Sequence, residues 1–172
     1  QCAVQGSLAL RKPLWCDDFK ILVNGTEWAG WHMEKGYITI DRVWAPSDTV
    51  VLELEMPAKF FHADSRIQDY CGKVALMRGP LVYCLEEIDN GAQLQELLID
   101  QNGTIKLEEG MILSFPTTTL LLDGYRETLR VEELYEPVKQ NKRTRVQIKA
   151  IPYFQWGNRA KDQEMRVWFR TV

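Results

Sequence analysis

Residues 50–56 read VVLELEM, and from Leu52 onward apolar and acidic side chains alternate. A period of two places the apolar side chains on one face and the glutamates on the other, which predicts a half-buried β-strand. Pro57 follows directly and cannot donate a ladder hydrogen bond, so we expect the strand to end there.

The segments before this strand follow the same pattern. Phe19, Ile21 and Val23 alternate with Lys20 and Leu22 along residues 19–23. This run ends at Asn24-Gly25, which is a strong reverse-turn pair. Residues 37–44 form a run of aromatic and β-branched side chains, and Pro46-Ser47-Asp48 links this run to residues 50–56. We therefore expect residues 37–44 and 50–56 to pair as a hairpin.

The second half of the chain repeats this pattern. Residues 74–77 and 81–85 lie on either side of Arg78-Gly79-Pro80, and residues 99–107 contain Asn102-Gly103, another hairpin signal. Three further runs read as strands: residues 117–122, which end at Asp123-Gly124, residues 145–150 and residues 165–170.

Helix signals are scarce. Asn90 is a candidate cap for one short helix. The apolar residues of 123–136 fit neither the period of a helix nor that of a strand. The predicted fold class is all-β, with antiparallel β-sandwiches and at most one short helix. The polar stretch at residues 64–72 favours two small packed sandwiches, residues 1–69 and residues 70–172.

The first predicted sandwich has only four or five strands, few for a layer pair that must cover both faces. We therefore expect it to be incomplete on its N-terminal side. The chain begins at Gln1, without an initiator Met or a visible signal peptide, which favours a cut into a longer polypeptide.

Composition argues against two classes of partner. The net charge is −3, whereas nucleic-acid binding needs a basic surface. No apolar run approaches the ~20 residues that span a bilayer. We expect neither a nucleic acid nor a membrane as partner.

The cysteines do not have the spacing of a zinc site. They form no CxxC pair, and only His32 and His62 are available to complete a ligand set. Cys84 lies in an apolar strand pattern, where a buried free thiol is common. The sequence does not decide whether any two cysteines form a disulfide. The four cysteines are Cys2, Cys16, Cys71 and Cys84.

Several motifs together resemble one family. They are LRKPLW at residues 10–15, Asn24-Gly25, RVW at residues 42–44, ALMRGPLVY at residues 75–83 and IPYFQWGNR at residues 151–159. The last two are the specific ones. The pattern resembles the C-terminal region of glycoside hydrolase family 127, the β-L-arabinofuranosidase-type enzymes formerly classed as a domain of unknown function. Ser47-Asp48 stands where that family usually has Gly-Asp.

The resemblance implies a non-catalytic accessory domain of a bacterial glycosidase. Family members carry a catalytic (α/α)-barrel followed by β-sandwiches, and their nucleophile is a zinc-ligating cysteine in the barrel. This chain has none of those motif positions, since Cys84 stands in LVYC rather than in a paired-cysteine motif. We therefore expect no catalytic residue and no metal ligand here, with zinc in the missing catalytic domain.

The partner that the resemblance implies is the protein's own catalytic (α/α)-barrel, which this region would support. A homodimer and a plant-type oligosaccharide stay open as further partners. The compartment also stays open between bacterial cytoplasm and periplasm.

The tryptophans suggest a rival function, a carbohydrate-binding module that stacks sugars on exposed aromatic rings. Trp28 and Trp31 lie in a segment that reads as a loop, and loops carry function more often than strands do. The alternative is packing, because aromatic side chains dominate the cores of β-sandwiches.

Residues 151–159 are the other candidate for ligand binding. Tyr153, Gln155, Asn158 and Arg159 could line a polar site, or a contact with the barrel. The alternative is a buried bend in which Asn158 and Arg159 hydrogen-bond to backbone groups that the proline and glycine leave unpaired. We favour the buried bend.

Overall fold

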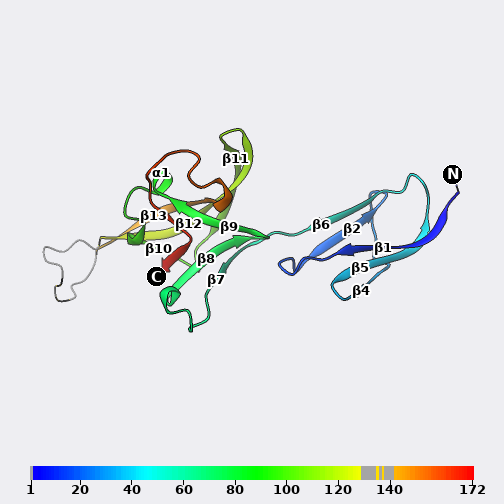
Figure 1. Ribbon diagram of the computed structural model, residues 1–172, viewed down its shortest axis with the longest axis horizontal. Helices are drawn as coiled ribbons and strands as arrows, with labels where there is room; N and C mark the ends of the chain where they lie inside the picture. Colours follow the sequence, from blue (N-terminus) through cyan, green and yellow to red (C-terminus); the bar gives the residue numbers. More distant parts are fainter. Residues whose placement is uncertain (1, 129–134, 136, 138–141) are drawn as a thin grey trace. The chain divides into compact units, whose positions relative to one another are not determined.

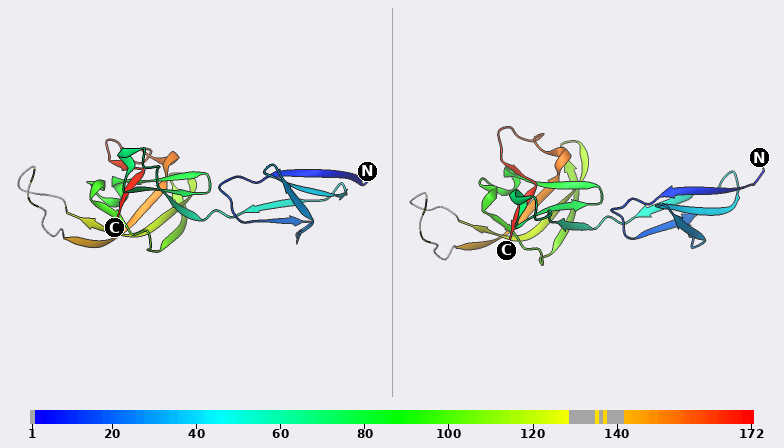
Figure 2. Two further views of the ribbon diagram at one scale, coloured as in Figure 1. Left: turned by 90° about the horizontal axis from the view of Figure 1, so that it is seen from below. Right: turned by 60° about the horizontal axis from the view of Figure 1, so that its bottom comes forward.

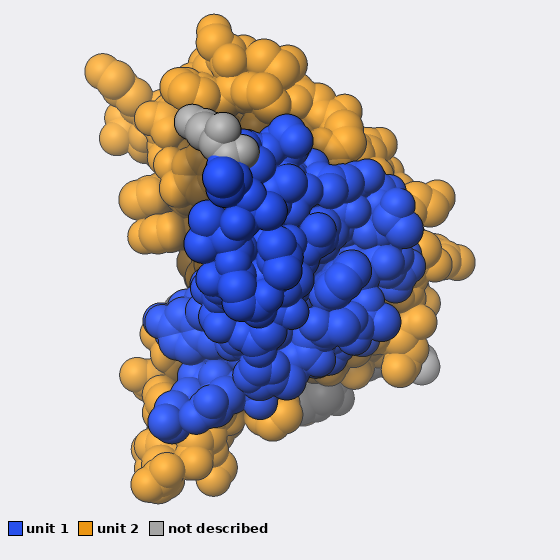
Figure 3. All heavy atoms as spheres, turned by 90° about the vertical axis from the view of Figure 1, so that its right-hand side faces the viewer, with its two compact units in different colours: residues 1–57 blue, residues 58–172 orange. Residues whose placement is uncertain are grey.

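The computed structural model describes residues 2–128, 135, 137 and 142–172. Strands dominate, with one short α-helix and a few 3-10 turns, so the all-β prediction is confirmed. The chain divides into two compact units, residues 1–57 and residues 58–172 (Figure 3). No helix among the described residues is long and apolar enough to cross a membrane.

The division lies earlier than the boundary expected between residues 69 and 70. The reason is strand β7 (Ala58–Phe61), which pairs with β8 (Lys73–Arg78) in the second unit. The polar stretch at residues 64–72 is therefore the connection between two paired strands rather than a linker between units.

The first unit consists of two three-stranded antiparallel sheets, ordered β1-β5-β4 and β3-β2-β6. Ile21 and Val23 of one sheet pack with Ile38 and Ile40 of the other, as the period-two pattern requires. The strands are β1 (Val4–Arg11), β2 (Phe19–Val23), β3 (Thr26–Glu27), β4 (Trp31–Glu34), β5 (Tyr37–Trp44) and β6 (Val50–Leu54).

The predicted hairpin of residues 37–44 and 50–56 is wrong. Strand β5 pairs with β1 and β4, whereas β6 pairs with β2, so the link between them crosses from one sheet to the other. Asp48 holds this crossing, because its carboxylate accepts hydrogen bonds from Ala45 N at 2.9 Å and Asn24 Nδ2 at 2.8 Å. The Asn24-Gly25 turn is confirmed: both residues have positive φ, 53° and 78°, and join β2 to β3.

In the second unit, six of the described strands pair in a closed ring, in the order β8-β9-β13-β12-β10-β15 and back to β8 (Figures 1 and 2). Closure leaves these six without a free edge. Strands β10 and β15 are parallel, and the other ring pairs are antiparallel. The ring encloses an apolar core that includes Leu76, Tyr83, Leu122 and Ile148.

The remaining bounds of the second unit are β9 (Leu81–Glu86), β10 (Leu97–Ile99), β11 (Ile105–Ile112), β12 (Phe115–Glu127), β13 (Arg143–Pro152), β14 (Met165–Arg166) and β15 (Trp168–Thr171). The short helical pieces are η1 (Gln68–Tyr70), α1 (Glu87–Asn90), η2 (Leu94–Glu96) and η3 (Tyr153–Gln155). Asn90 ends α1 instead of capping its start.

Two turn signals in this unit had another role. The Asn102-Gly103 turn connects β10 to β11, but these two strands both pair with β12 and not with each other, so the predicted hairpin is wrong. Gly124 does not end a strand, because β12 continues to Glu127. A Cβ at Gly124 would lie 2.5 Å from both Ile148 Cδ1 and Leu98 O, so close packing requires glycine there.

Candidate functional site

The predicted ligand-binding residues lie in two different units. Trp28 and Trp31 belong to the first unit, and Tyr153, Gln155, Asn158 and Arg159 belong to the second.

Trp28 is packed rather than presented. Its ring is half-buried against the core of the first unit, and the Arg42 guanidinium lies 5.2 Å from the ring centroid. Its indole nitrogen donates to Gly30 O at 3.0 Å. Trp31, on β4, is more exposed, at 39%, with its ring tilted against Phe19 at 5.1 Å between centroids.

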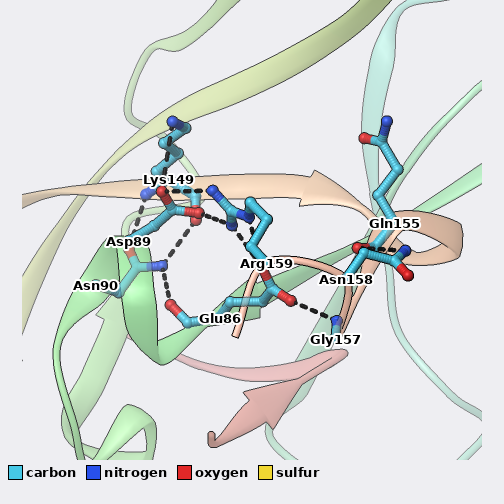
Figure 4. A network of polar contacts seen from close by, with 8 residues as sticks. All are labelled: Glu86, Asp89, Asn90, Lys149, Gln155, Gly157, Asn158 and Arg159. Atoms are coloured by element: carbon cyan, nitrogen blue, oxygen red, sulfur yellow. Dashed lines mark hydrogen bonds and ion pairs between the residues drawn. The ribbon is translucent and has the colours of Figure 1, made fainter. Parts of the chain in front are cut away.

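Arg159 is the centre of a buried ion-pair cluster (Figure 4). Its guanidinium donates to Glu86, which ends β9, and to Asp89 of α1. Nε lies 3.2 Å from Glu86 Oε2, and Nη1 lies 3.2 Å from Asp89 Oδ1. One planar guanidinium thus connects two carboxylates from adjacent elements. Its two hydrogen bonds to Asp89 form a bidentate pair, the arrangement in which arginine–carboxylate hydrogen bonds are strong.

Further contacts tie this cluster to strand β13. Lys149 Nζ lies 3.4 Å from Asp89 Oδ1, and Gly157 N donates to Glu86 Oε1 at 2.8 Å. The Asn90 amide donates to Lys149 O at 2.8 Å and accepts from Lys149 N at 2.8 Å. The cluster therefore fastens α1 and the segment after η3 onto the closed ring.

Arg159 and Asp89 are stabilised in their charged forms within the cluster. Hydrogen bonding to Asp89 raises the pKa of the Arg159 guanidinium further above its usual range. Burial alone would raise the pKa of Asp89, but hydrogen bonds and charge from Arg159 and Lys149 outweigh it, so the pKa falls. Groups stabilised in their ionised forms serve structure better than proton transfer near neutral pH.

Gln155 and Asn158 also turn toward the protein. Gln155 is buried and donates from Nε2 to Thr117 Oγ1 at 2.7 Å, which ties η3 to strand β12. Asn158 Nδ2 donates to Gln155 O at 3.1 Å and closes the bend. Gln155 Oε1 is buried without a hydrogen-bond partner in the described part of the chain.

The aromatic residues of the same segment point the other way. Tyr153 and Trp156 are 43% and 44% exposed, and their rings are nearly parallel, with 6.1 Å between centroids and 13° between planes. Trp156 lines an open hollow of about 390 Å³, together with Glu86, Gly157 and residues 160–163. Sequence reasoning did not identify this hollow or the carboxylates of Glu86 and Asp89.

The donor set around Cys84 does not fit a zinc site. Cys84 is fully buried, and burial, with the nearby charge of Glu86, raises its pKa to about 12. A zinc ligand must be a thiolate. Among the described residues, no group of three or more His, Cys, Asp or Glu side chains could hold a metal ion.

Comparison with known proteins gives matches to both units. Residues 1–56 match the model of the "Beta-L-arabinofuranosidase, GH127 middle domain", and residues 58–170 match that of the "Glycoside hydrolase family 127 C-terminal domain". The two matches meet where the structure divides into its units.

Individual relatives agree with the family models. A non-reducing end β-L-arabinofuranosidase from Bifidobacterium longum subsp. longum is 33% identical over 175 aligned positions, which cover 94% of this chain and 25% of the relative.

The crystal structure of a GH127 β-L-arabinofuranosidase from Geobacillus stearothermophilus T6 is 34% identical with a TM-score of 0.89, covering 99% of this chain and 27% of that one. A further solved structure, described as a glycoside hydrolase, is 32% identical with a TM-score of 0.85 and covers 98% and 28%. This chain thus spans about a quarter of the length of the relatives it matches. The two domain matches, in chain order and meeting at the boundary between the units, show that the chain belongs to glycoside hydrolase family 127.

Proposed function

We propose that this chain is a non-catalytic part of a longer glycosidase resembling the β-L-arabinofuranosidases, and that it supports the catalytic domain. The observation that carries this proposal is the use of the buried charged side chains. Glu86 and Asp89 are both paired with Arg159 in a buried cluster, and Cys84 is a fully buried thiol whose pKa is raised to about 12, so neither the carboxylates nor the thiol is placed to attack a substrate. The zinc chemistry that the resemblance implies would belong to the catalytic domain outside this chain.

The tip of the β11–β12 hairpin is the surface best suited to contact that domain. Strand β11 pairs only with β12 among the described strands (Figure 1). Met111, Leu113 and Phe115 are 61%, 62% and 65% exposed at this tip. Large apolar side chains gathered at an exposed tip indicate a contact surface.

The conformation of Leu113 supports the same interpretation. Leu113 has φ of 55°, in the left-handed region that glycine or asparagine adopts more easily. A leucine there costs about 1–3 kcal/mol, and its side chain, 62% exposed, gains little burial within this chain in return. A contact with the catalytic domain would supply the missing gain.

The first experiment assays the purified chain and the longer glycosidase on a chromogenic β-L-arabinofuranoside. We expect turnover by the longer protein and none by the chain alone. Turnover by the chain that persists after further purification would overturn the proposal that it is non-catalytic.

The second experiment tests the support role in the longer glycosidase. Met111→Ser combined with Phe115→Ser should lower the melting temperature of the catalytic domain by about 5 °C or more, because interface anchors contribute more than 1 kcal/mol each. Ile67→Ser is the matched control, since Ile67 is 49% exposed in the β7–β8 connection. Equal melting temperatures for the tip variant and the control would contradict a contact at this tip.

A carbohydrate-binding role through Trp28 and Trp31 has less support. Arg42 lies over the Trp28 ring, so a sugar could not stack on that face. Trp31 offers a partly exposed ring on strand β4, where every residue is exposed.

A further inference from the structure

The loop that lines the hollow beside Trp156 is fixed at both ends. Near its start, Gly157 N and the Arg159 guanidinium bind the Glu86 carboxylate. At its end, Glu164 N donates to Glu87 Oε2 at 3.0 Å, and Glu87 N donates to Glu164 O at 3.1 Å. Residues 160–163 are therefore held between two anchors, and they form one wall of the hollow.

The end of the loop has an additional anchor on η2. The Glu164 carboxylate accepts hydrogen bonds from Gln93 N at 3.2 Å and Leu94 N at 2.8 Å. A loop bound in this way keeps its shape before any ligand arrives, so little ordering entropy opposes binding.

Several polar groups in the hollow are available to a ligand. In the described part of the chain, the side chains of Lys161, Asp162 and Gln163 have no hydrogen-bond partner. The indole nitrogen of Trp156 has none there either, in contrast to that of Trp44, which donates to Gly6 O at 3.0 Å. Donors and acceptors thus surround an exposed aromatic ring.

The Trp156 ring is also supported from behind. Tyr153 lies nearly parallel to it, so the two rings form one ordered stack on η3 and the residue that follows. Offset stacking of this kind stabilises ring orientation. The Trp156 ring is therefore a preformed flat apolar surface in a hollow that also carries polar groups.

These properties select a class of ligand. Lys161 and Asp162 carry opposite charges, and Glu86 is already neutralised by Arg159, so the hollow has no excess charge for a phosphate or another strong anion. Its lining combines polar groups with the apolar Trp156 ring, so a purely apolar ligand would leave those polar groups without partners. A sugar ring fits both features, because its C–H face stacks on an indole and its hydroxyl groups exchange hydrogen bonds with amide, carboxylate and ammonium groups.

We propose that the hollow formed by Trp156, Gly157 and residues 160–163 binds one ring of a neutral oligosaccharide. Trp156 provides the stacking face, and Lys161, Asp162 and Gln163 bind hydroxyl groups at the rim. The choice of a pentose-containing probe rests on the proposed function of the chain. The site itself follows from the geometry of the second unit.

The experiment titrates the ¹⁵N-labelled chain with arabinotriose and follows the indole N–H resonances by NMR. We expect the Trp156 resonance to shift saturably at millimolar sugar, the affinity range of an open site that contacts a single ring. Trigalacturonate, an anionic trisaccharide, should produce a weaker shift. No saturable shift of Trp156, or a stronger response to trigalacturonate, would refute the proposal.

Two variants separate stacking from general effects on the fold. Trp156→Ala should weaken arabinotriose binding by about tenfold or more, followed through the backbone amides of residues 160–163. Gln163→Ala should weaken arabinotriose binding by a smaller factor and leave the melting temperature unchanged. This variant therefore still tests binding at the hollow if Trp156→Ala lowers the stability of the fold. Trp31→Ala is the matched control, since Trp31 is similarly exposed but lies in the first unit.

The result of the sugar titration does not depend on whether the chain supports the catalytic domain. Sugar binding is measured on the chain alone, whereas support is measured as stability of the longer protein. Binding that is lost in Trp31→Ala and kept in Trp156→Ala would move the site to the first unit and overturn this inference, while the proposed function would stand.

Discussion

Replacing Arg159 by methionine tests whether the cluster of Glu86, Asp89 and Arg159 is structural. The substitution keeps much of the apolar stem and removes the charge. It leaves the Glu86 and Asp89 side chains, 5% and 11% exposed, without their shared cation. Breaking a buried pair costs about 3–5 kcal/mol. Lys149 still faces Asp89 at 3.4 Å, and Gly157 N still donates to Glu86, so we expect about 3 kcal/mol.

Urea unfolding at pH 7 measures this loss. Because the two units can unfold separately, the transition should be followed through NMR resonances of the second unit. With a denaturant slope of about 2 kcal/mol/M, the loss of free energy lowers the midpoint by roughly 1.5 M. Arg159→Lys should fall between wild type and Arg159→Met, because one ammonium cannot reproduce the two-sided fork.

The same variant makes a prediction about pH. In the wild type the folded pKa of Asp89 lies below its ordinary value of 3.8, so the stability from Asp89 is present above pH 3.8 and is lost as the pH falls through the lower folded pKa. Without Arg159, the effect of burial on Asp89 outweighs its remaining contacts, so the folded pKa of Asp89 rises. The cost of burying the unpaired Asp89 carboxylate then disappears as acid protonates it. The difference in free energy of unfolding should therefore shrink between pH 7 and pH 4.

The control is Arg66→Met. Arg66 donates to Asp64 at 2.9 Å, but both side chains are exposed, so we expect no measurable change in stability. A loss below about 1 kcal/mol for Arg159→Met, or a loss that stays constant from pH 7 to pH 4, would refute the structural role assigned to the cluster.

Three further predictions concern single positions. Gly124→Ala should lower the free energy of unfolding of the second unit by about 2–3 kcal/mol, because the new Cβ would collide with Ile148 and a backbone carbonyl; Gly110→Ala, with open space around it, should be nearly neutral in the same urea titration. Cys84 should resist an aromatic disulfide reagent at pH 8 in the native protein while the exposed Cys71 reacts, as mass spectrometry of labelled peptides would show; rapid labelling of Cys84 would contradict its pKa of about 12. Leu113→Asn should raise the stability of the isolated chain by about 1 kcal/mol by relieving a strained turn, and a decrease would show that the exposed leucine packs within the chain.

The strands could be predicted because burial on one face leaves a period of two in the sequence. Their partners could not, because a turn signal shows only that the chain reverses. Asn102-Gly103 reverses the chain between β10 and β11, yet both of these strands pair with β12. Asp123-Gly124 resembles a turn, but Gly124 is required by contacts with Leu98 and Ile148, which are distant in sequence.

The sequence singled out residues 151–159 but not the arrangement of their side chains. Gln155, Asn158 and Arg159 all make hydrogen bonds within the protein, while ligand binding by this segment stays a prediction. The partners Glu86 and Asp89 stand 73 and 70 residues away from Arg159, and no local pattern links residues at that separation. Only the closed ring of strands brings β9, α1 and the end of β13 together.

The buried bend and the proposed sugar-binding hollow lie on opposite sides of one segment. Gln155 and Arg159 face the protein, whereas Tyr153 and Trp156 face solvent. The inward contacts fix the backbone on which the aromatic rings stand, and a weak ligand needs such preorganisation because it offers few contacts to offset loop ordering. A structural role for Arg159 is therefore compatible with the proposed sugar binding at Trp156, because it fixes the backbone that carries the ring.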